Sequence, residues 1–271
     1  MMVLQCGIFR LSRVRYHMER IALISDIHGN IVALETVLSD IRQRGIQRVF
    51  CLGDVVGKGP DPDKAVDICR NACEHVMMGN WDAIIVHENP AFPFPKGLGL
   101  HAKWHREKLG AERLDYLEHL PGTVDLLMSG RKVRLFHASQ QGVYYRVFHN
   151  DPIEKHLAMF DNTDFTGYNF TPDVIGYADI HYPYRRLYDG RMLFNIGSVG
   201  NPLDKPLACY EILEGNYGSG DIAPFSVSLV RLPYDIDFAV RRAYDSHMPD
   251  IEPYEIELRT ARYRGLPPNR L

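Results

Sequence analysis

The 271-residue sequence predicts a single domain of the α/β class. In its first part, short apolar runs of strand length alternate with longer segments that have helical spacing. Each of these apolar runs ends in a short polar turn. In its second part, apolar runs follow one another across tight turns, which indicates antiparallel strands. We therefore expect strands of both directions, with the polar turns at the strand ends as the candidate site.

The first expected strand, residues 21–25, leads directly into Asp26 and His28. Side chains two residues apart on an extended chain leave the same face, so both can point at one ion above the end of the strand. Asn30 is a favourable N-cap for a helix over residues 31–41, whose apolar residues recur at helical spacing. Taken alone, the stretch also fits a buried strand whose aspartate only caps the next helix.

The next two expected strands repeat this pattern. Residues 48–52 form a second apolar run, which ends at Asp54, and residues 75–78 lead into Asn80 and Asp82. Three strand ends in succession therefore carry an Asp-x-His, a Gly-Asp and a Gly-Asn-x-Asp sequence. Because such turns gather at one edge of a parallel sheet, we expect their side chains to lie close together.

Later strand ends add further polar side chains. His137 follows directly after one expected strand, and Asp179 and His181 follow another. The remaining patterns predict helices over residues 62–72, 101–109, 112–120, 151–160 and 235–245, and strands over residues 123–128, 132–136, 173–176, 185–188, 192–194, 207–213 and 225–231. We expect residues 1–17 to be an extension, residues 18–248 to be the domain, and residues 249–271 to be an amphipathic or loose tail.

The composition is that of a globular protein, with 45% hydrophobic and 24% charged residues. A net charge of -3 and an isoelectric point near 6.5 argue against a nonspecific nucleic-acid-binding protein, which is usually basic. Five cysteines are an odd number and indicate no disulfide framework, which favours a reducing, cytoplasmic compartment. No apolar run approaches the ~20 residues of a membrane span, so we expect no membrane association.

Side chains at the strand ends form a candidate metal site: Asp26, His28, Asp54, Asn80, His137, Asp179 and His181. All are oxygen or imidazole donors without a cysteine, a mixture that suits Mn²⁺, Fe, Zn²⁺ or Ni²⁺. These donors are too many for one tetrahedral ion. They would fill two sites that share a bridging carboxylate, with the ions ~3.5–4 Å apart.

This ordered set of motifs, ending in His181-x-Pro183, resembles the calcineurin-like metallophosphoesterase superfamily. The resemblance covers about residues 19–245 and includes residues 53–62 and 195–202. It is similar in particular to the small prokaryotic branch, which holds phosphodiesterases and proteins labelled diadenosine tetraphosphatase. The resemblance implies a four-layer αββα sandwich of two mixed sheets flanked by helices, with the metals at the strand ends.

The resemblance also implies how the candidate residues share two divalent ions across a bridging Asp54. One ion would be held by Asp26, His28 and His181, and the other by Asn80, His137 and Asp179. We expect the ions to be Mn²⁺, with Fe, Zn²⁺, Ni²⁺ or Mg²⁺ as alternatives. The implied reaction is attack of a metal-bridging hydroxide on a phosphodiester or phosphoanhydride of a small, nucleotide-like substrate.

Departures from the family pattern bear on activity. Aspartate stands at Asp179 where the family usually has a histidine, and this harder oxygen donor would favour Mn²⁺ or Mg²⁺ over Zn²⁺. Trp81 stands where many members have a histidine that protonates the leaving group, which an indole cannot do. It would instead pack or stack on a nucleobase. Leu203 stands where an arginine often binds phosphate, and Arg185 or Arg186 could replace it.

Alternative functions stay open at this point. Ser/Thr phosphatases share the motifs, so a phosphomonoesterase acting on phosphoproteins is one alternative. A degenerate, metal-binding regulatory protein with little turnover is another, and all three departures point that way. We expect Asp54 and Asn80 to take part in catalysis, supported by the neighbouring Asp82. Asp179 would either bind the second ion or only orient His181.

Overall fold

The computed structural model describes residues 17–87 and 98–266. Its described strands form two five-stranded sheets, in the orders β10-β9-β1-β2-β3 and β4-β5-β6-β8-β7. The strands are β1 (Glu19–Ile24), β2 (Arg48–Cys51), β3 (His75–Val76), β4 (Thr123–Met128), β5 (Arg131–Phe136), β6 (Val174–Tyr177), β7 (Tyr184–Tyr188), β8 (Arg191–Asn195), β9 (Ala208–Gly215) and β10 (Ser226–Leu232). The helices are α1 (Ile31–Gln43), α2 (Pro62–Ala72), α3 (Asn80–His87), α4 (Leu98–Glu118), α5 (Ile153–Ala158), α6 (Ile236–Ser246) and α7 (Ile251–Thr260), followed by a short 3-10 turn over Tyr263–Gly265.

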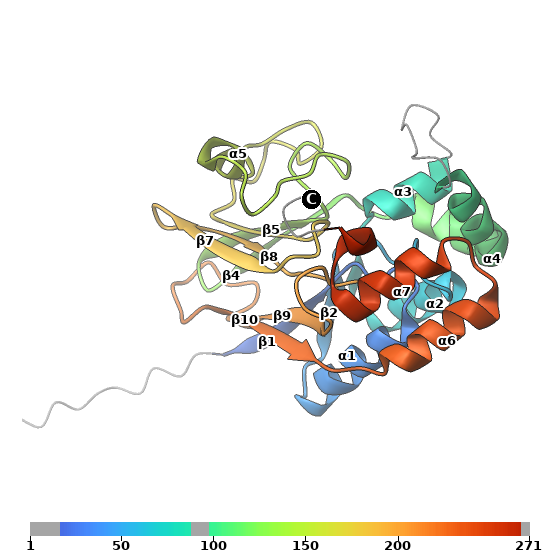
Figure 1. Cartoon of the computed structure of the whole chain (residues 1–271). Helices are drawn as coiled ribbons and strands as arrows, with labels where there is room; N and C mark the ends of the chain where they lie inside the picture. Colours follow the sequence, from blue (N-terminus) through green and yellow to red (C-terminus); the bar gives the residue numbers. More distant parts are fainter. Residues whose placement is uncertain (1–16, 88–97, 267–271) are drawn as a thin grey trace, which may run out of the picture.

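The two sheets pack face to face and are covered by helices on their outer faces (Figure 1). Leu23 and Phe50 of the first sheet share a buried apolar cluster with Leu135 and Phe194 of the second. A second apolar cluster joins the first sheet to α1 and α2, and a third lies on the far side of the second sheet, next to α5. The expected four-layer αββα sandwich is therefore confirmed.

Parallel strands in the middle of each sheet bring the polar turns to one edge. β1 runs parallel to β2, and β2 to β3. In the other sheet β5 runs parallel to β6, and β6 to β8. The turns that follow β1, β2, β3, β5 and β6 carry the candidate ligands. Their carboxyl ends meet where the two sheets adjoin, which is the usual position of sites in α/β folds.

Helix α1 begins where its sequence predicts, whereas helix α3 begins at Asn80, where we expected only a polar turn. The Asn30 side chain accepts a hydrogen bond from the Ala33 amide at 3.2 Å and so caps α1. Helix α4 spans residues 98–118, but Gly110, with a φ of 70° and a ψ of 171°, interrupts the helical backbone. The two expected helices over residues 101–109 and 112–120 are therefore two halves of α4 that meet at this glycine.

The segment after residue 248, which we expected to be a tail, forms helix α7 and packs on the body of the protein. Tyr254 and Leu258 of α7 are buried and share an apolar cluster with Ala239 and Val240 of α6. The extension expected at residues 1–17 lies outside the described residues, apart from His17. None of the described helices is long and apolar enough to cross a membrane. The cysteines in the described part of the chain are free thiols.

Candidate metal centre

The turns that carry the candidate ligands have an unusual backbone. Five of the seven candidates have a positive φ, between 50° and 65°: Asp26, His28, Asp54, Asp179 and His181. Residues other than glycine rarely adopt this conformation, although aspartate and histidine do so more readily than most. Such strained residues persist where the surrounding structure holds them, and they concentrate at functional sites.

Hydrogen bonds between the turns hold this backbone in place. The amide of Asp26 donates to the Gly53 carbonyl at 3.0 Å, and the amide of His28 donates to the Asp54 carbonyl at 3.0 Å. The Ser198 hydroxyl donates to the Asp26 carbonyl at 2.8 Å. The loops after β1, β2 and β8 are therefore joined directly, and the ligand-bearing side chains start from a rigid frame.

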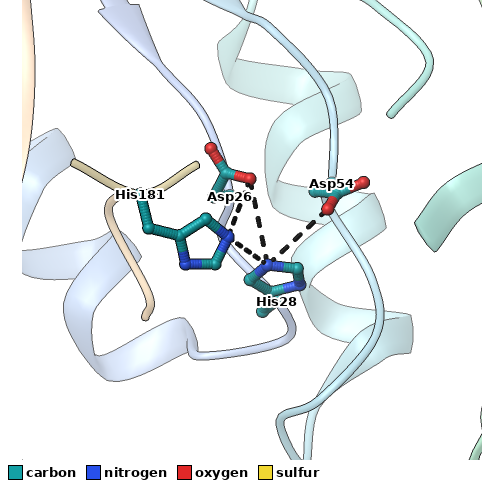
Figure 2. Close-up of side chains that lie close together, drawn as sticks. All are labelled: Asp26, His28, Asp54 and His181. Carbon is teal, nitrogen blue, oxygen red and sulfur yellow. Dashed lines mark hydrogen bonds and ion pairs between the residues drawn. The ribbon is translucent and has the colours of Figure 1, made fainter. Parts of the chain in front are cut away.

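A first cluster consists of Asp26, His28, Asp54 and His181, whose side chains point toward one another (Figure 2). All four are buried, and one candidate ligand atom from each lies within 4.8 Å of the others. The Nε2 atom of His181 lies 3.1 Å from the Nε2 atom of His28 and 3.1 Å from Asp26 Oδ1. Two ligand atoms that bind one ion at right angles at ~2.1 Å lie ~3.0 Å apart, so this spacing fits a shared cation.

Backbone carbonyl groups orient the histidine rings. Each ring has its Nδ1 atom beside a carbonyl oxygen: His28 beside Val56 at 3.1 Å, His137 beside Leu52 at 2.8 Å, and His181 beside Asn201 at 2.5 Å. A ring that donates from Nδ1 keeps the lone pair of Nε2 for a metal, an arrangement common in metal sites. All three Nε2 atoms face other candidate ligands, as this arrangement requires.

A second cluster surrounds the Nε2 atom of His137. This nitrogen lies 3.2 Å from Asn80 Oδ1, 3.4 Å from Asp54 Oδ1 and 3.8 Å from Asp179 Oδ1. The other oxygen of Asp54, Oδ2, lies 3.6 Å from His28 Nε2 in the first cluster. Asp54 therefore turns one oxygen to each cluster, and the structure brings together all seven candidates in the grouping that the family resemblance implies.

The buried carboxylates call for positive charge. Both side-chain oxygens of Asp26 and the Oδ2 atom of Asp179 are buried without a hydrogen-bond partner among the described residues. Burial acts to lower the pKa of His137, but the charges of Asp54, Asp26 and Asp179 outweigh it and raise that pKa to about 10. A buried carboxylate without a partner is costly unless a cation balances it. The donor set and its unpaired oxygens therefore fit divalent metal ions.

At His28 the net shift of the pKa has the opposite direction. Burial, followed by the neighbouring His181 and Lys58, lowers the pKa of His28 well below its ordinary value. Its imidazole is therefore neutral, which is the form that binds a metal. Burial raises the pKa of Asp179, and the guanidinium of Arg146 opposes that effect.

Asp82, which we expected to support catalysis, is fully buried and binds backbone amides. Its Oδ1 atom accepts a hydrogen bond from the Val56 amide at 3.1 Å, and its Oδ2 atom accepts one from the Gly79 amide at 3.0 Å. Burial, with the charge of Asp54, raises the pKa of Asp82 to about 7. Asp82 thus ties the loop after β2 to the start of α3 and positions the neighbouring ligands.

Trp81 lies beside the first cluster. Its amide donates to Asp54 Oδ1 at 2.8 Å, and its ring centroid lies 6.3 Å from that of His28. The indole lies against the backbone of Gly57, where an added Cβ would come within 2.7 Å of the ring. It also lines a pocket together with residues from the loop after β2, from α4, and from α7 and the residues next to it: Lys58, His101, Asp250, Pro253, Tyr254, Glu257, Tyr263 and Arg264.

The C-terminal helix reaches the site through Glu257, a contact that the sequence patterns did not reveal. The Lys58 amine donates to Asn201 Oδ1 at 2.6 Å and to Glu257 Oε2 at 3.1 Å. The Asn201 amide donates to the same Glu257 oxygen at 2.9 Å. Because the Asn201 carbonyl orients His181, helix α7 supports a candidate ligand indirectly.

The arginine next to the site is not one that we expected. Arg185 donates to the Val227 carbonyl at 2.7 Å, and the guanidinium of Arg186 lies over the Tyr184 ring at 5.7 Å. Arg146 instead places its Nη2 atom 3.1 Å from Asp179 Oδ1. Nothing in the local sequence around Arg146 signals this contact, because it depends on how the loop after β5 folds back.

Comparisons with known proteins identify the family. Residues 19–216 match the calcineurin-like phosphoesterase superfamily domain. The chain is 29% identical over 251 residues to an uncharacterized protein of Methanocaldococcus jannaschii, and the match covers 85% of this chain and 94% of that relative. Among solved structures, it is similar to a metallophosphoesterase from Sphaerobacter thermophilus, with 25% identity, a TM-score of 0.68, and coverage of 90% of this chain and 99% of that chain. A hypothetical protein from Pyrococcus horikoshii OT3 shares the fold, with 18% identity, a TM-score of 0.71, and coverage of 92% and 99%. With the family model matched over most of its length, the chain belongs to the calcineurin-like phosphoesterase superfamily.

Proposed function

We propose that this protein is a two-metal hydrolase of phosphodiester or phosphoanhydride bonds in small, nucleotide-like substrates. The observation that carries the proposal is the position of Asp54. Its Oδ2 atom lies 3.6 Å from His28 Nε2, and its Oδ1 atom lies 3.4 Å from His137 Nε2. A carboxylate between two groups of donors is the arrangement that two neighbouring cations need, because its negative charge reduces their repulsion.

Two divalent ions bound there would supply an activated water and neutralise charge on the phosphoryl group. The protein would supply the frame for this reaction. His28, His137 and His181 present Nε2 atoms whose rings are oriented by backbone carbonyls. Asn80 can bind a metal only through its oxygen, which leaves its NH₂ group to donate to a phosphoryl oxygen. We propose Mn²⁺ as the metal, because Asp179 adds a hard oxygen donor where the family usually has histidine.

The pocket beside Trp81 supports a substrate with an aromatic part. Trp81, His101 and Tyr263 contribute rings to its lining, and aromatic side chains stack on nucleobases of any sequence. The charged residues of the pocket balance one another, because Lys58 pairs with Glu257 and Arg264 pairs with Asp250. The rings favour small nucleotides over phosphoproteins, whose side chains carry no ring to fill the pocket unless the modified residue is tyrosine.

The proposal is tested by measuring metal content and hydrolysis of bis(p-nitrophenyl) phosphate with Mn²⁺. Asp54→Asn removes the shared negative charge and should lower both metal occupancy and turnover. Because loss of a group that only supports a ligand costs 10–100-fold, loss of the bridge itself should cost at least ~100-fold in turnover. Asp115→Asn is the matched control, because the Asp115 side chain on α4 is 77% exposed.

The outcomes separate the proposal from its alternatives. Two bound metals together with diester hydrolysis would support it. Hydrolysis of p-nitrophenyl phosphate alone would favour a phosphomonoesterase. Metal binding without turnover of any ester would favour a regulatory protein, which the lack of a proton donor at Trp81 makes a specific alternative. Wild-type turnover and two metals in Asp54→Asn would show that the binuclear proposal is wrong.

A further inference from the structure

Arg146 connects the buried site with its surface. The Nη2 and Nε atoms of Arg146 lie 3.1 Å and 3.2 Å from Asp179 Oδ1. The Asp179 side chain is 1% exposed, whereas the Arg146 side chain is 45% exposed. The guanidinium therefore has one edge against the candidate metal centre and the rest toward solvent, from which a substrate must arrive.

The backbone next to Arg146 is firmly held. The neighbouring Val147 is buried, and its carbonyl accepts a hydrogen bond from the Tyr177 hydroxyl at 2.7 Å. The next residue, Phe148, receives a bond at its carbonyl from His156 at 2.8 Å and donates its amide to Asp151 at 2.7 Å. The backbone that carries the Arg146 side chain is therefore anchored immediately after this residue.

Asp179 uses its two oxygens differently. Both Arg146 contacts go to Oδ1, whereas Oδ2 is buried and has no hydrogen-bond partner among the described residues. Oδ1 also lies 3.8 Å from His137 Nε2, so Arg146 meets the oxygen that faces the second cluster, and Oδ2 remains as a further acceptor. A histidine at this position could not both bind a metal and accept from Arg146, because a ring that binds a metal through one nitrogen has only an N–H donor left.

We propose that Arg146 binds the phosphoryl oxygens of the substrate and that Asp179 positions it for this task. The proposal rests on the proposed function, and it supplies the phosphate-binding cation that Leu203 does not. A guanidinium has five N–H donors in a planar fork that matches phosphate geometry. Two of them face Asp179, and among the described residues no other hydrogen-bond partner occupies the remainder.

A simpler role for Arg146 is to neutralise Asp179 without touching the substrate. The two roles differ in what the loss of Arg146 changes. An arginine that binds phosphate affects phosphate affinity and leaves metal content alone. An arginine that only balances Asp179 affects metal content first, because a buried carboxylate without a partner shifts its protonation.

The test is calorimetric titration of the Mn²⁺-loaded protein with inorganic phosphate, together with elemental analysis of bound metal. Arg146→Gln should weaken phosphate binding by ~10- to 100-fold, which is typical for a hydrogen bond to a charged group, with unchanged metal content. Arg146→Lys keeps the charge but loses the planar fork of donors, so its phosphate affinity should lie between those of the wild type and Arg146→Gln. Arg186→Gln is the control, since Arg186 is exposed and lies over Tyr184, and its affinity should match that of the wild type.

Phosphate affinity of Arg146→Gln within twofold of the wild type would overturn the proposal, and so would loss of metal from that variant. A wild-type protein that binds metal but no phosphate would overturn it as well. Because the titration needs no turnover, failure of the wild type to hydrolyse any ester would count against the proposed function alone. The two proposals therefore fail by different measurements.

Discussion

Replacing Trp81 by histidine tests whether this protein lacks a general acid. The Trp81 amide donates to Asp54 Oδ1 at 2.8 Å, so the side chain starts directly beside the candidate bridge. Its ring centroid lies 6.3 Å from that of His28, so an imidazole at position 81 would face the same cluster. A positioned general acid accelerates departure of a poor leaving group by ~10²–10⁴-fold. A leaving group of low pKa, such as p-nitrophenolate, needs no such help.

We therefore expect Trp81→His to raise hydrolysis of a dinucleotide, from which a sugar alkoxide leaves, by ~100-fold or more relative to bis(p-nitrophenyl) phosphate. The smaller ring gives up part of the contact with Gly57, which should cost about 1–2 kcal/mol of unfolding free energy and leave the protein folded. Steady-state rates for both esters decide the matter. Trp104→His on α4 is the control, because Trp104 is also half-buried but does not line the pocket. An equal change for both esters in Trp81→His would refute the missing-acid explanation.

Further predictions concern the metal, the C-terminal helix and a buried acid. Asp179→His should shift the ratio of Mn²⁺-supported to Zn²⁺-supported turnover toward Zn²⁺, and an unchanged ratio would mean that Asp179 is no ligand. Leu258→Ala should lower the free energy of unfolding in urea by about 2–4 kcal/mol, because Leu258 is 1% exposed, whereas Ile256→Ala at a 39% exposed position of α7 should change it little. Burial raises the pKa of Glu211 to about 7, although Arg185 opposes this. This acid holds more protons in the folded than in the unfolded protein, so its contribution to stability is lost as the pH rises from about 4.5 to 7. Glu211→Gln should remove that loss in melting curves recorded across this range.

The grouping of the strand-end candidates was predictable because their positions follow from local rules. Asp26 and His28 are two residues apart after a strand, and parallel strands bring their carboxyl ends to one edge. The structure indeed places them with Asp54 and His181 in one buried group. The assignment of each oxygen of Asp54 to a different cluster needed the three-dimensional arrangement, because a sequence shows which residues carry oxygen but not where the oxygens point.

Helix α7 was harder to predict because its start carries no capping signal. Asp250 precedes the helix with a φ of 57°, and its side chain makes no capping hydrogen bond. Without a cap, the helical spacing of Tyr254 and Leu258 alone did not distinguish a packed helix from a loose tail. The helix gains its stability from tertiary contacts instead, including the Lys58–Glu257 ion pair at 3.1 Å.

The contact with Arg146 changes how Asp179 is understood. Judged as a ligand alone, Asp179 is a departure that weakens the second site, since it replaces an imidazole by a carboxylate that burial disfavours. Its partner alters this assessment, because Arg146 is 33 residues away in the sequence and meets Asp179 only when the loop after β5 folds back. A carboxylate has lone pairs for both a cation and an arginine, whereas a metal-bound imidazole has only an N–H donor left. Asp179 and Arg146 are therefore best considered as one unit, in which the aspartate holds a positive charge beside the candidate metal centre.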